Sequence, residues 1–491
     1  MCQPLLRKLL VLALCAAVSA CYAMRSSSGG GQTSFTPPRN VNAADIALPE
    51  GYRIEAVATG LTFPTGITFD DTGGIYVVEA GYSYGEAWTT PRLVRIESEG
   101  RTVPLASGGK NGPWTGVTFH DGAFYVAEGG ELEGGSILRI TKDGQITRLI
   151  DGLPSKGDHH TNGPAIGPDG RIYFAIGTYT NSAVTGEDNA KFGWLKRYPE
   201  VHDIPCQDIT LTGENFTTAN PLKPDSTEEV TTGAFSPFGT KTQSGQVIRG
   251  RLPCNGSILR MRPDGTQLEL VAWGFRNPFG MAFSEDGGLF VTDNQYDERG
   301  SRPVFGAGDL LWAVKPGIWY GWPDFHGNHS LNEGDHHKPP GKETPRLLLA
   351  KHPNTPPEPV AILGVHASGN GFDFSRNSQF GHMGEAFVAE FGDQAPETGK
   401  VLSPVGFKVV RVDMKSGVIN DFAVNKGGTN GPASWLGQGG LERPVAARFD
   451  PSGTALYVVD FGIMMMSKAG AGPQKETGVV WRITRTAASL K

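Results

Sequence analysis

Cysteine is scarce in this sequence. There are five cysteines in 491 residues, and three of them, Cys2, Cys15 and Cys21, lie close to the N-terminus. Only Cys206 and Cys254 remain in the rest of the chain. In an oxidising compartment such a leftover pair is expected to form a disulfide, the alternative being two unpaired buried thiols. We therefore predict a Cys206–Cys254 disulfide that joins the ends of a long, loop-like stretch.

Long apolar runs are also lacking. The run over 9–20 follows Arg7 and Lys8 and is too short for a comfortable transmembrane helix, so it is expected to be an export signal. The residues up to Cys21 are similar to the lipobox of bacterial lipoproteins, in which the cysteine is acylated; ordinary cleavage nearby is the alternative. We expect a lipoprotein signal peptide over 1–20, lipidation at Cys21 and a flexible tether over 21–48. The protein would then be an exported bacterial lipoprotein, periplasmic or anchored to the outer membrane.

Positive charge is not in excess. The chain has 44 Lys and Arg against 50 Asp and Glu, a net charge of −6, and it shows no basic stripe. Nucleic acid is therefore not an expected partner. Glycine and proline, in contrast, are abundant, at 68 and 35 residues, which is typical of an all-β, turn-rich protein.

A short phrase returns six times along the chain. Each copy is an apolar strand, an acidic or glycine-containing turn, and a second apolar strand led by an aromatic residue: Tyr76, Tyr125, Tyr173, Phe290, Phe387 and Tyr457. A second phrase of the form L-x-R-I follows the copies, as at 93–96 and 480–483. Two hairpins per unit make a four-stranded blade, so the repeat predicts an all-β, six-bladed β-propeller with four-stranded blades over 49–486. A β-sandwich with similar hairpins is the alternative.

The spacing of the repeat is uneven. The third and fourth intervals are much longer than a bare blade needs, which places two long loop insertions at about 178–254 and 297–366. Ordered loops of this length are usually functional. In a propeller we expect them to lie over one face.

The residues just before each copy are the candidates for a central site, because the loops that enter the innermost strands line one mouth of the channel. Blade by blade they are 63–65, 111–114, 158–161, 276–278, 366–369 and 442–444. These stretches are rich in His, Arg, Asn, Asp and Glu, which fits an anionic or polyhydroxylated ligand.

Within this set His159 is the natural general base, because Asp158 beside it can orient the imidazole. A structural or metal-binding role of the 159–160 His pair is the alternative, and the His pair at 336–337 is expected in a solvated loop. Asp293, Asp297 and Glu298 follow the fourth copy. They are either oxygen ligands for Ca²⁺ or a solvated acidic turn.

The motifs at these positions resemble those of the glucose/sorbosone dehydrogenase family. Over most of 50–485 the chain is similar to these six-bladed propellers, which use pyrroloquinoline quinone (PQQ) to oxidise sugars. The segments that carry the resemblance are His159-His160-Thr161-Asn162-Gly163 before a GPDG turn, Arg276-Asn277-Pro278, Asp297-Glu298 followed by Tyr320-Gly321-Trp322-Pro323, Ser368-Gly369, and Lys110-Asn111-Gly112.

The resemblance implies a role for each matching residue. His159 would be the catalytic base, and the cofactor would be contacted by Lys110, Arg276, Asn277, Ser368 and Gly369. Glu298, by its side chain, and Tyr320, by its carbonyl, would hold Ca²⁺. The chain departs from the family at Lys110, where the family has Gln, and at Asp393, where better-studied members carry basic residues. Asp393 is expected to repel a tricarboxylate quinone, an effect that Lys110, Lys400 or Lys408 would have to offset.

The function that the resemblance implies is PQQ-dependent oxidation of a sugar, an aldose or a sugar aldehyde, to a lactone or acid. His159 would take the hydroxyl proton while a hydride passes to the quinone, and electrons would leave to an acceptor that the sequence does not identify. One alternative is a cofactor-free, lipid-tethered propeller that captures a carbohydrate. A calcium-dependent lactonase is the other.

Overall fold

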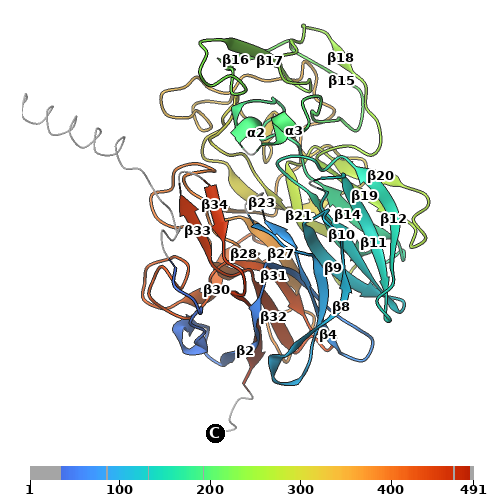
Figure 1. Ribbon diagram of the computed structural model, residues 1–491, viewed down its shortest axis with the longest axis vertical. Helices are drawn as coiled ribbons and strands as arrows, with labels where there is room; N and C mark the ends of the chain where they lie inside the picture. Colours follow the sequence, from blue (N-terminus) through green and yellow to red (C-terminus); the bar gives the residue numbers. More distant parts are fainter. Residues whose placement is uncertain (1–34, 84–86, 131, 192, 468–469, 487–491) are drawn as a thin grey trace, which may run out of the picture.

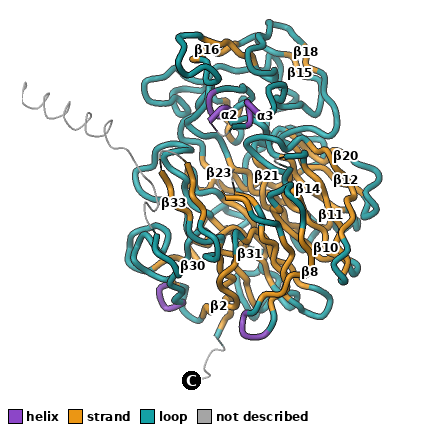
Figure 2. The backbone as a smooth tube through the Cα atoms, viewed as in Figure 1, coloured by secondary structure: helices purple, strands orange, loops and turns teal. Residues whose placement is uncertain are grey.

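The computed structural model of this protein describes residues 35–486 apart from 84–86, 131, 192 and 468–469. The predicted signal peptide, Cys21 and the first part of the predicted tether lie outside these residues. The described chain is almost entirely β and forms six blades around a central axis (Figures 1 and 2), as the repeat predicts. None of its helices combines the length and the apolar character needed to cross a membrane.

The first three blades follow the chain in order, each an antiparallel sheet with its first strand innermost. Blade 1 contains β3 (Pro64–Phe69), β4 (Ile75–Glu79), β7 (Arg92–Ile96) and β8 (Thr102–Ser107). Blade 2 contains β9 (Trp114–His120), β10 (Ala123–Glu128), β11 (Gly135–Thr141) and β12 (Ile146–Leu153). Blade 3 contains β13 (Thr161–Ile166), β14 (Ile172–Ile176), β19 (Ser257–Met261) and β20 (Glu269–Trp273).

The last three blades repeat this order. Blade 4 contains β21 (Asn277–Phe283), β22 (Leu289–Asn294), β23 (Gly308–Val314) and β26 (Ala361–Val365). Blade 5 contains β27 (Gly369–Phe374), β28 (Ala386–Glu390), β29 (Lys408–Val412) and β30 (Ile419–Asn425). Blade 6 contains β31 (Pro444–Phe449), β32 (Ala455–Asp460) and β35 (Gly478–Arg485) from the C-terminal part of the chain, and β2 (Tyr52–Leu61) from the N-terminal part.

Blade 6 closes the ring. Strand β2 pairs antiparallel with β35 over its whole length, with Ile54 opposite Ile483. The outermost strand of the last blade therefore comes from the beginning of the propeller, and the two ends of the fold are joined by main-chain hydrogen bonds.

The second half of the predicted tether is packed rather than flexible. Strand β1 (Ile46–Ala47) pairs with β30 at the edge of blade 5, just after the 3-10 turn η1 (Ala43–Asp45). The Arg39 guanidinium is buried and forms a 2.6 Å ion pair with Asp460 in blade 6. The prediction of a tether up to residue 48 was wrong in this part, because a buried ion pair and a strand pairing between distant residues leave no local signal.

The repeated aromatic residues build the core between blades. Tyr76 of blade 1 packs on Phe124 of blade 2, with ring centroids 4.4 Å apart. Phe290 of blade 4 packs on Phe374 of blade 5 at 5.2 Å, and Tyr457 of blade 6 packs on Phe69 of blade 1 at 5.0 Å. The apolar core is consequently divided into clusters between neighbouring blades, and burial of these rings holds each blade to the next.

The two insertions lie together over one end of the ring (Figure 1). The first, between β14 and β19, contains α2 (Glu187–Lys191), α3 (Trp194–Arg197), β15 (Ile209–Thr210), β16 (Asn215–Ala219), β17 (Glu229–Gly233) and β18 (Val247–Ile248). The second is divided by β23, which returns to blade 4, and its longer part contains β24 (Phe325–His326) and β25 (His329–Ser330). Both contribute to one apolar cluster, in which Phe235 packs on Trp322 at 5.6 Å.

The predicted disulfide is present. Cys206 and Cys254 are bonded within the first insertion, 48 residues apart in the sequence. The bond ties the middle of this insertion to the residues that lead into β19.

Candidate active site at the mouth of the channel

A polar pocket opens on the ring face that the insertions cover. Its walls include Asp158 and His159 before β13, Arg276 before β21, and His366 and Ser368 before β27. The loops that enter the innermost strands of blades 3, 4 and 5 thus meet at one mouth. The corresponding loops of blades 1, 2 and 6 contribute to a deeper, more apolar part of the channel, lined by Thr65, Pro113 and the start of β31.

The acid that ends several copies of the repeat positions these loops. In blade 4, one carboxylate oxygen of Asp293 accepts the backbone N–H groups of Arg276 at 3.1 Å and Asn277 at 2.8 Å. Asp460 receives the corresponding N–H groups before β31 in the same way. Burial raises the pKa of Asp293 to about 7. The repeat therefore fixes the backbone that carries the site residues.

His159 faces the pocket as a neutral base. Its Nδ1 lies 3.0 Å from the carbonyl oxygen of Thr178, and because a carbonyl only accepts, Nδ1 carries the proton and Nε2 has the free lone pair. Nε2 lies 3.6 Å from the Asp158 carboxylate. Burial lowers the pKa of His159 to about 3, although Asp158 acts in the opposite direction. At neutral pH this imidazole is therefore uncharged.

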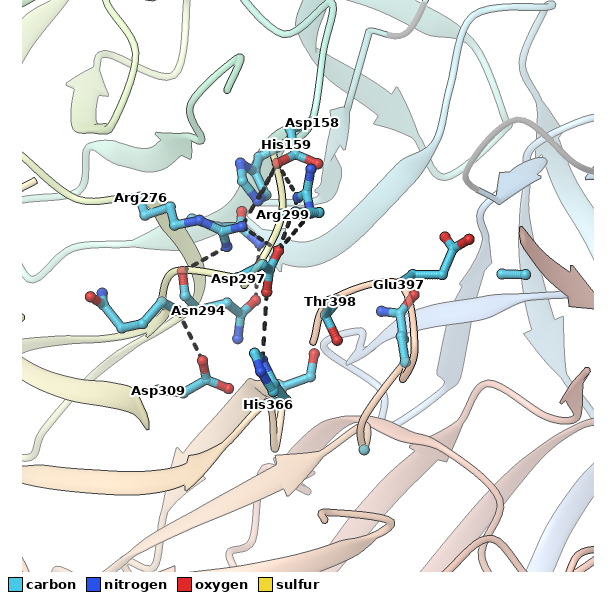
Figure 3. A pocket seen from close by; sticks show the side chains of 16 residues that line it. Asp158, His159, Arg276, Asn294, Asp297, Arg299, Asp309, His366, Glu397 and Thr398 are labelled. Atoms are coloured by element: carbon cyan, nitrogen blue, oxygen red, sulfur yellow. Dashed lines mark hydrogen bonds and ion pairs between the residues drawn. The ribbon is translucent and has the colours of Figure 1, made fainter. Parts of the chain in front are cut away.

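Beside His159 lies a buried network of carboxylates and guanidiniums (Figure 3). The Asp297 carboxylate pairs with Arg276 at 2.6 Å and with Arg299 at 2.9 Å. Burial opposes the ionisation of Asp297, but the two guanidiniums outweigh it and hold its pKa well below the usual range. The predicted alternative of a solvated acidic turn does not describe Asp297, since its side chain is only 8% exposed.

Arg276 and Asn277 are held in place by their neighbours. Arg276 donates from Nε and Nη2 to Asn181 and from Nη1 to the carbonyl of Asn294. Asn277 donates to the Asn294 side chain at 2.9 Å and accepts from Asn162 at 3.0 Å. Within the described residues, Nη1 of Arg276 and the side-chain amide of Asn277 each have one N–H that makes no hydrogen bond.

The structure brings Ser368 and Gly369 to the same place. Ser368 lines both parts of the channel and has a positive φ of 52°. The N–H of Gly369 donates to Asp309 at 3.0 Å, so Asp309 positions this loop as Asp293 positions that of blade 4. Lys110 differs: it is exposed and lies outside the walls of the channel.

The two predicted calcium ligands have different surroundings. Glu298 is half-buried. Burial raises the pKa of its carboxyl group, and the positive charges of His366 and Lys400 oppose this. Tyr320 stacks on Phe275 at 4.4 Å, and its hydroxyl donates to the carbonyl of Ala313. Among the described residues, no group of three or more His, Cys, Asp or Glu side chains could hold a metal ion.

The structure also corrects the prediction for Asp393. This side chain is 1% exposed and does not line the pocket. Its carboxylate accepts the N–H groups of Ala395 at 3.2 Å and Val405 at 2.9 Å, so it closes the loop after β28. The repulsion expected between Asp393 and an anionic ligand is therefore absent at close range, because the carboxylate points into its own loop.

Several wall residues had no signal in the sequence. Arg299, Asp309 and Asn294 all line the pocket, together with Gln394, Glu397 and Thr398 from the loop after β28. Asn294 directly follows the acid of the fourth repeat and could have been found from that position. Arg299 could not, because two of its partners, Asp158 and Asp188, are separated from it by more than a hundred residues.

The comparisons with known proteins agree with this architecture. No family model matches the chain. Quinoprotein glucose dehydrogenase B of Acinetobacter calcoaceticus is 27% identical over 181 residues, which are 36% of this chain and only 29% of that protein. The PQQ domain of pyranose dehydrogenase from Coprinopsis cinerea, in its holo form, is similar in structure with a TM-score of 0.54 and 14% identity, over 92% of this chain and 98% of that one. The soluble aldose sugar dehydrogenase of Escherichia coli, in its apo form, has a TM-score of 0.50 and 14% identity, over 88% and 99%.

Proposed function

We propose that this chain, whose resemblance to the glucose/sorbosone dehydrogenases is confirmed by these comparisons, is a sugar oxidoreductase with His159 as its general base. The observation that carries the proposal is the neutral imidazole of His159, buried at the channel mouth with its Nε2 lone pair free and with Arg276 and Asn277 close by. A base of this kind can take the proton of a sugar hydroxyl.

The chain's own residues support each part of that step. Thr178 holds the His159 ring by the bond to Nδ1, and Asp158 lies next to Nε2, where an imidazolium would form. Asn294, Gln394 and Thr398 provide amide and hydroxyl groups along the wall, which suits the many hydroxyls of a sugar. The product would be a lactone or an acid.

The donors in the pocket fit the carbonyl groups of an ortho-quinone such as PQQ. The free N–H groups of Arg276 and Asn277 suit quinone carbonyls. Nε2 of His366 is buried and has no hydrogen-bond partner among the described residues; burial opposes its protonation, but Asp297 outweighs this and raises the pKa of His366. Arg276, Asn277 and His366 would hold the quinone, which would supply the acceptor for the hydride.

Calcium stays a prediction. Its proposed ligands are the side chain of Glu298 and the main-chain carbonyl of Tyr320. Titration of the protein with Ca²⁺, followed by calorimetry and compared with Glu298→Gln, tests it: equal binding by both proteins would remove Glu298 as a ligand.

The proposed activity is tested by reconstitution with PQQ and Ca²⁺ and by reduction of an acceptor dye with a panel of aldoses. We expect His159→Ala to lower kcat by about 10²- to 10⁴-fold, the range of a general base. The spectral change on PQQ titration should persist in this variant, because His159 is not among the residues expected to hold the quinone. His336→Ala, at an exposed loop histidine, is the control.

Two results would contradict the proposal. Equal activity of His159→Ala and the native protein would show that His159 is not the general base. Sugar binding without any dye reduction or PQQ spectrum would instead select the cofactor-free carbohydrate-binding propeller. One observation favours this second candidate: two buried guanidiniums face three buried carboxylates at the site, so little net positive charge is left for a tricarboxylate.

We also propose that the protein is exported and lipidated at Cys21, as the N-terminal motif indicates. Labelling of expressing cells with a palmitate analogue tests this. The label should appear on the native protein and be lost in Cys21→Ala.

A further inference from the structure

Arg299 connects three separate parts of the chain at the candidate site. It lies in the loop between β22 and β23, and its guanidinium contacts Asp158 before β13, Asp188 in α2 of the first insertion, and Asp297 in its own loop. The distances to Asp188 and Asp297 are 3.0 and 2.9 Å. The Arg299 side chain is 13% exposed, and the three carboxylates are more deeply buried still.

Each nitrogen of this guanidinium has a carboxylate partner. Nε donates to Asp297 at 3.0 Å, Nη1 to Asp188 at 3.0 Å, and Nη2 to Asp158. A planar fork with fixed donors can make such contacts in three directions, whereas a lysine ammonium on its flexible stem cannot reproduce them. The geometry therefore requires arginine rather than positive charge alone.

Gly300 allows this approach. It has a φ of 79°, and a Cβ at this position would lie 2.7 Å from a carboxylate oxygen of Asp188. The loop can bring Arg299 against α2 only because the next residue has no side chain and tolerates the left-handed conformation.

We propose that Arg299 is a positioning residue for the oxidation: it fixes Asp158 beside His159, keeps the imidazole available as a base, and makes the site depend on the docked first insertion. This inference rests on the proposed function for its catalytic consequence. Its structural part, the control of the His159 environment through Asp158, stands on the contacts alone.

The physical reason is the balance of buried charge. The charged groups that face His159 are Asp158, Arg276, Arg299 and Asp297. Without Arg299, Asp188 would lose its 3.0 Å ion pair, and Asp158 and Asp297 would share the guanidinium of Arg276, with His366 as a further partner of Asp297. An uncompensated Asp158 would then attract a proton to the adjacent imidazole, and an imidazolium cannot act as a base.

The test uses the full protein and the variants Arg299→Met, Arg299→Lys and Asp188→Asn. The first readout is histidine proton NMR of the protein without added cofactor, with the His159 signal identified by its loss in His159→Ala. In the native protein we expect no titration of His159 between about pH 5 and 8, because its pKa lies near 3. In Arg299→Met the pKa of His159 should rise into this pH range. Asp188→Asn should keep His159 neutral but release the insertion, seen as faster proteolysis of residues 178–254.

The second readout is dye reduction by the reconstituted enzyme. We expect kcat of Arg299→Met to fall by about tenfold for each pH unit below the new pKa of His159, while KM changes little, because only the neutral imidazole acts as a base. Arg299→Lys should remain impaired. Guanidinium ion, added to an Arg299→Ala variant below its unfolding transition, should restore part of kcat.

The matched control is Arg302→Met. Arg302 lies in the same loop and is more deeply buried, but it pairs with Asp324 at 3.2 Å and has no ion pair with Asp158. The Arg302→Met variant should have a lower Tm than the native protein, but the pKa of His159 should stay below about pH 5. If Arg299→Met does not fold, Arg299→Lys with its impaired kcat and the guanidinium rescue carry the same test.

The outcomes separate the two proposals. If the native protein oxidises no sugar, the proposed function fails, and the NMR titration still decides the role of Arg299. If His159 remains untitrated in Arg299→Met and kcat stays within about threefold of the native value, the positioning role is overturned. The positioning role is overturned as well if Arg302→Met shifts the pKa of His159 as strongly as Arg299→Met does.

Discussion

Buried carboxylates in this protein titrate in opposite directions according to their partners. Asp297 is buried but paired with two guanidiniums, which hold its pKa well below the usual range. Glu442 is also buried and accepts hydrogen bonds from Ser434, and burial raises its pKa to about 7. One buried carboxyl group is thus held ionised at the channel mouth, whereas the other titrates near neutral pH.

The raised pKa values predict a pH dependence of stability. Burial raises the pKa of Asp203, Asp293, Glu390 and Glu442 to about 7, so the folded state binds more protons than the unfolded chain between about pH 4 and 7. The contribution of these four carboxyl groups to the free energy of unfolding is complete below their pKa in the unfolded chain and is lost as pH rises through 7. We expect Tm to be higher at pH 6.5 than at pH 8.

The variant Glu442→Gln isolates one of these groups. Its Tm should change less between pH 6.5 and 8 than that of the native protein, because one titrating carboxyl is gone. Glu343→Gln, at an exposed position, should leave the slope unchanged. A native Tm that rises with pH over this range would show that these carboxyls are ionised in the folded state.

Each copy of the repeated motif has two structural roles in its blade. Its aromatic residue packs against the next blade, as Tyr76 does against Phe124. Its terminal acid binds the backbone of the loop that enters the same blade, as Asp293 does at Arg276. Blade 3 ends instead in Ile176, and there Asn255 binds the carbonyl of Gly177 from the first insertion. Asn255 also donates to the carbonyl of Pro154, so it links the loop before β13 to the end of β14.

The disulfide is the covalent element of this insertion. Closing a loop of 48 residues is worth about 4 kcal/mol in the chain-entropy account, so the double variant Cys206→Ser/Cys254→Ser should lose up to about that much in the free energy of unfolding of the insertion. Urea unfolding followed by tryptophan fluorescence measures it, since Trp194, Trp319 and Trp322 lie in this region.

Each single cysteine variant should lose about as much as the double variant, because either change removes the whole bond. Additive losses from the two single variants would show instead that the packing of the two side chains matters more than the bond.

At the scale of the whole molecule, stability depends on ring closure between the two ends of the propeller. Strand β2 covers the outer edge of β35, and Arg39 reaches the buried Asp460 of the same blade. A chain that begins at residue 62 would leave β35 as an exposed edge and Asp460 without its cation.

We therefore expect the chain beginning at residue 62 to aggregate or to lack a cooperative unfolding transition, as judged by size-exclusion chromatography and near-ultraviolet circular dichroism. A chain beginning at residue 35 keeps every contact described here and should retain the native Tm. A monomeric, cooperatively folded product from residue 62 onwards would refute the role of closure.

Much of the fold could be predicted because its signals are local. Turn residues and strand alternation repeat with each blade, so the number of blades and the position of the mouth follow from counting. The candidate site was predicted only where a residue belongs to a short motif, as with His159, Arg276 and Ser368. The exposure of Lys110 and the bonds of Asp393 within its own loop could not be predicted, because a loop motif does not say which way a side chain turns.

The six-bladed ring, the disulfide pair and the loops that meet at the channel follow from the order of residues, because each depends on residues close together in a repeat or on elimination among few candidates. The charge state of the site follows from the folded arrangement alone. The neutral His159, the permanently ionised Asp297 and the three-way contact of Arg299 arise from burial and from partners far apart in the chain. Such electrostatic effects depend on distance and solvent exclusion, which residue order alone does not contain.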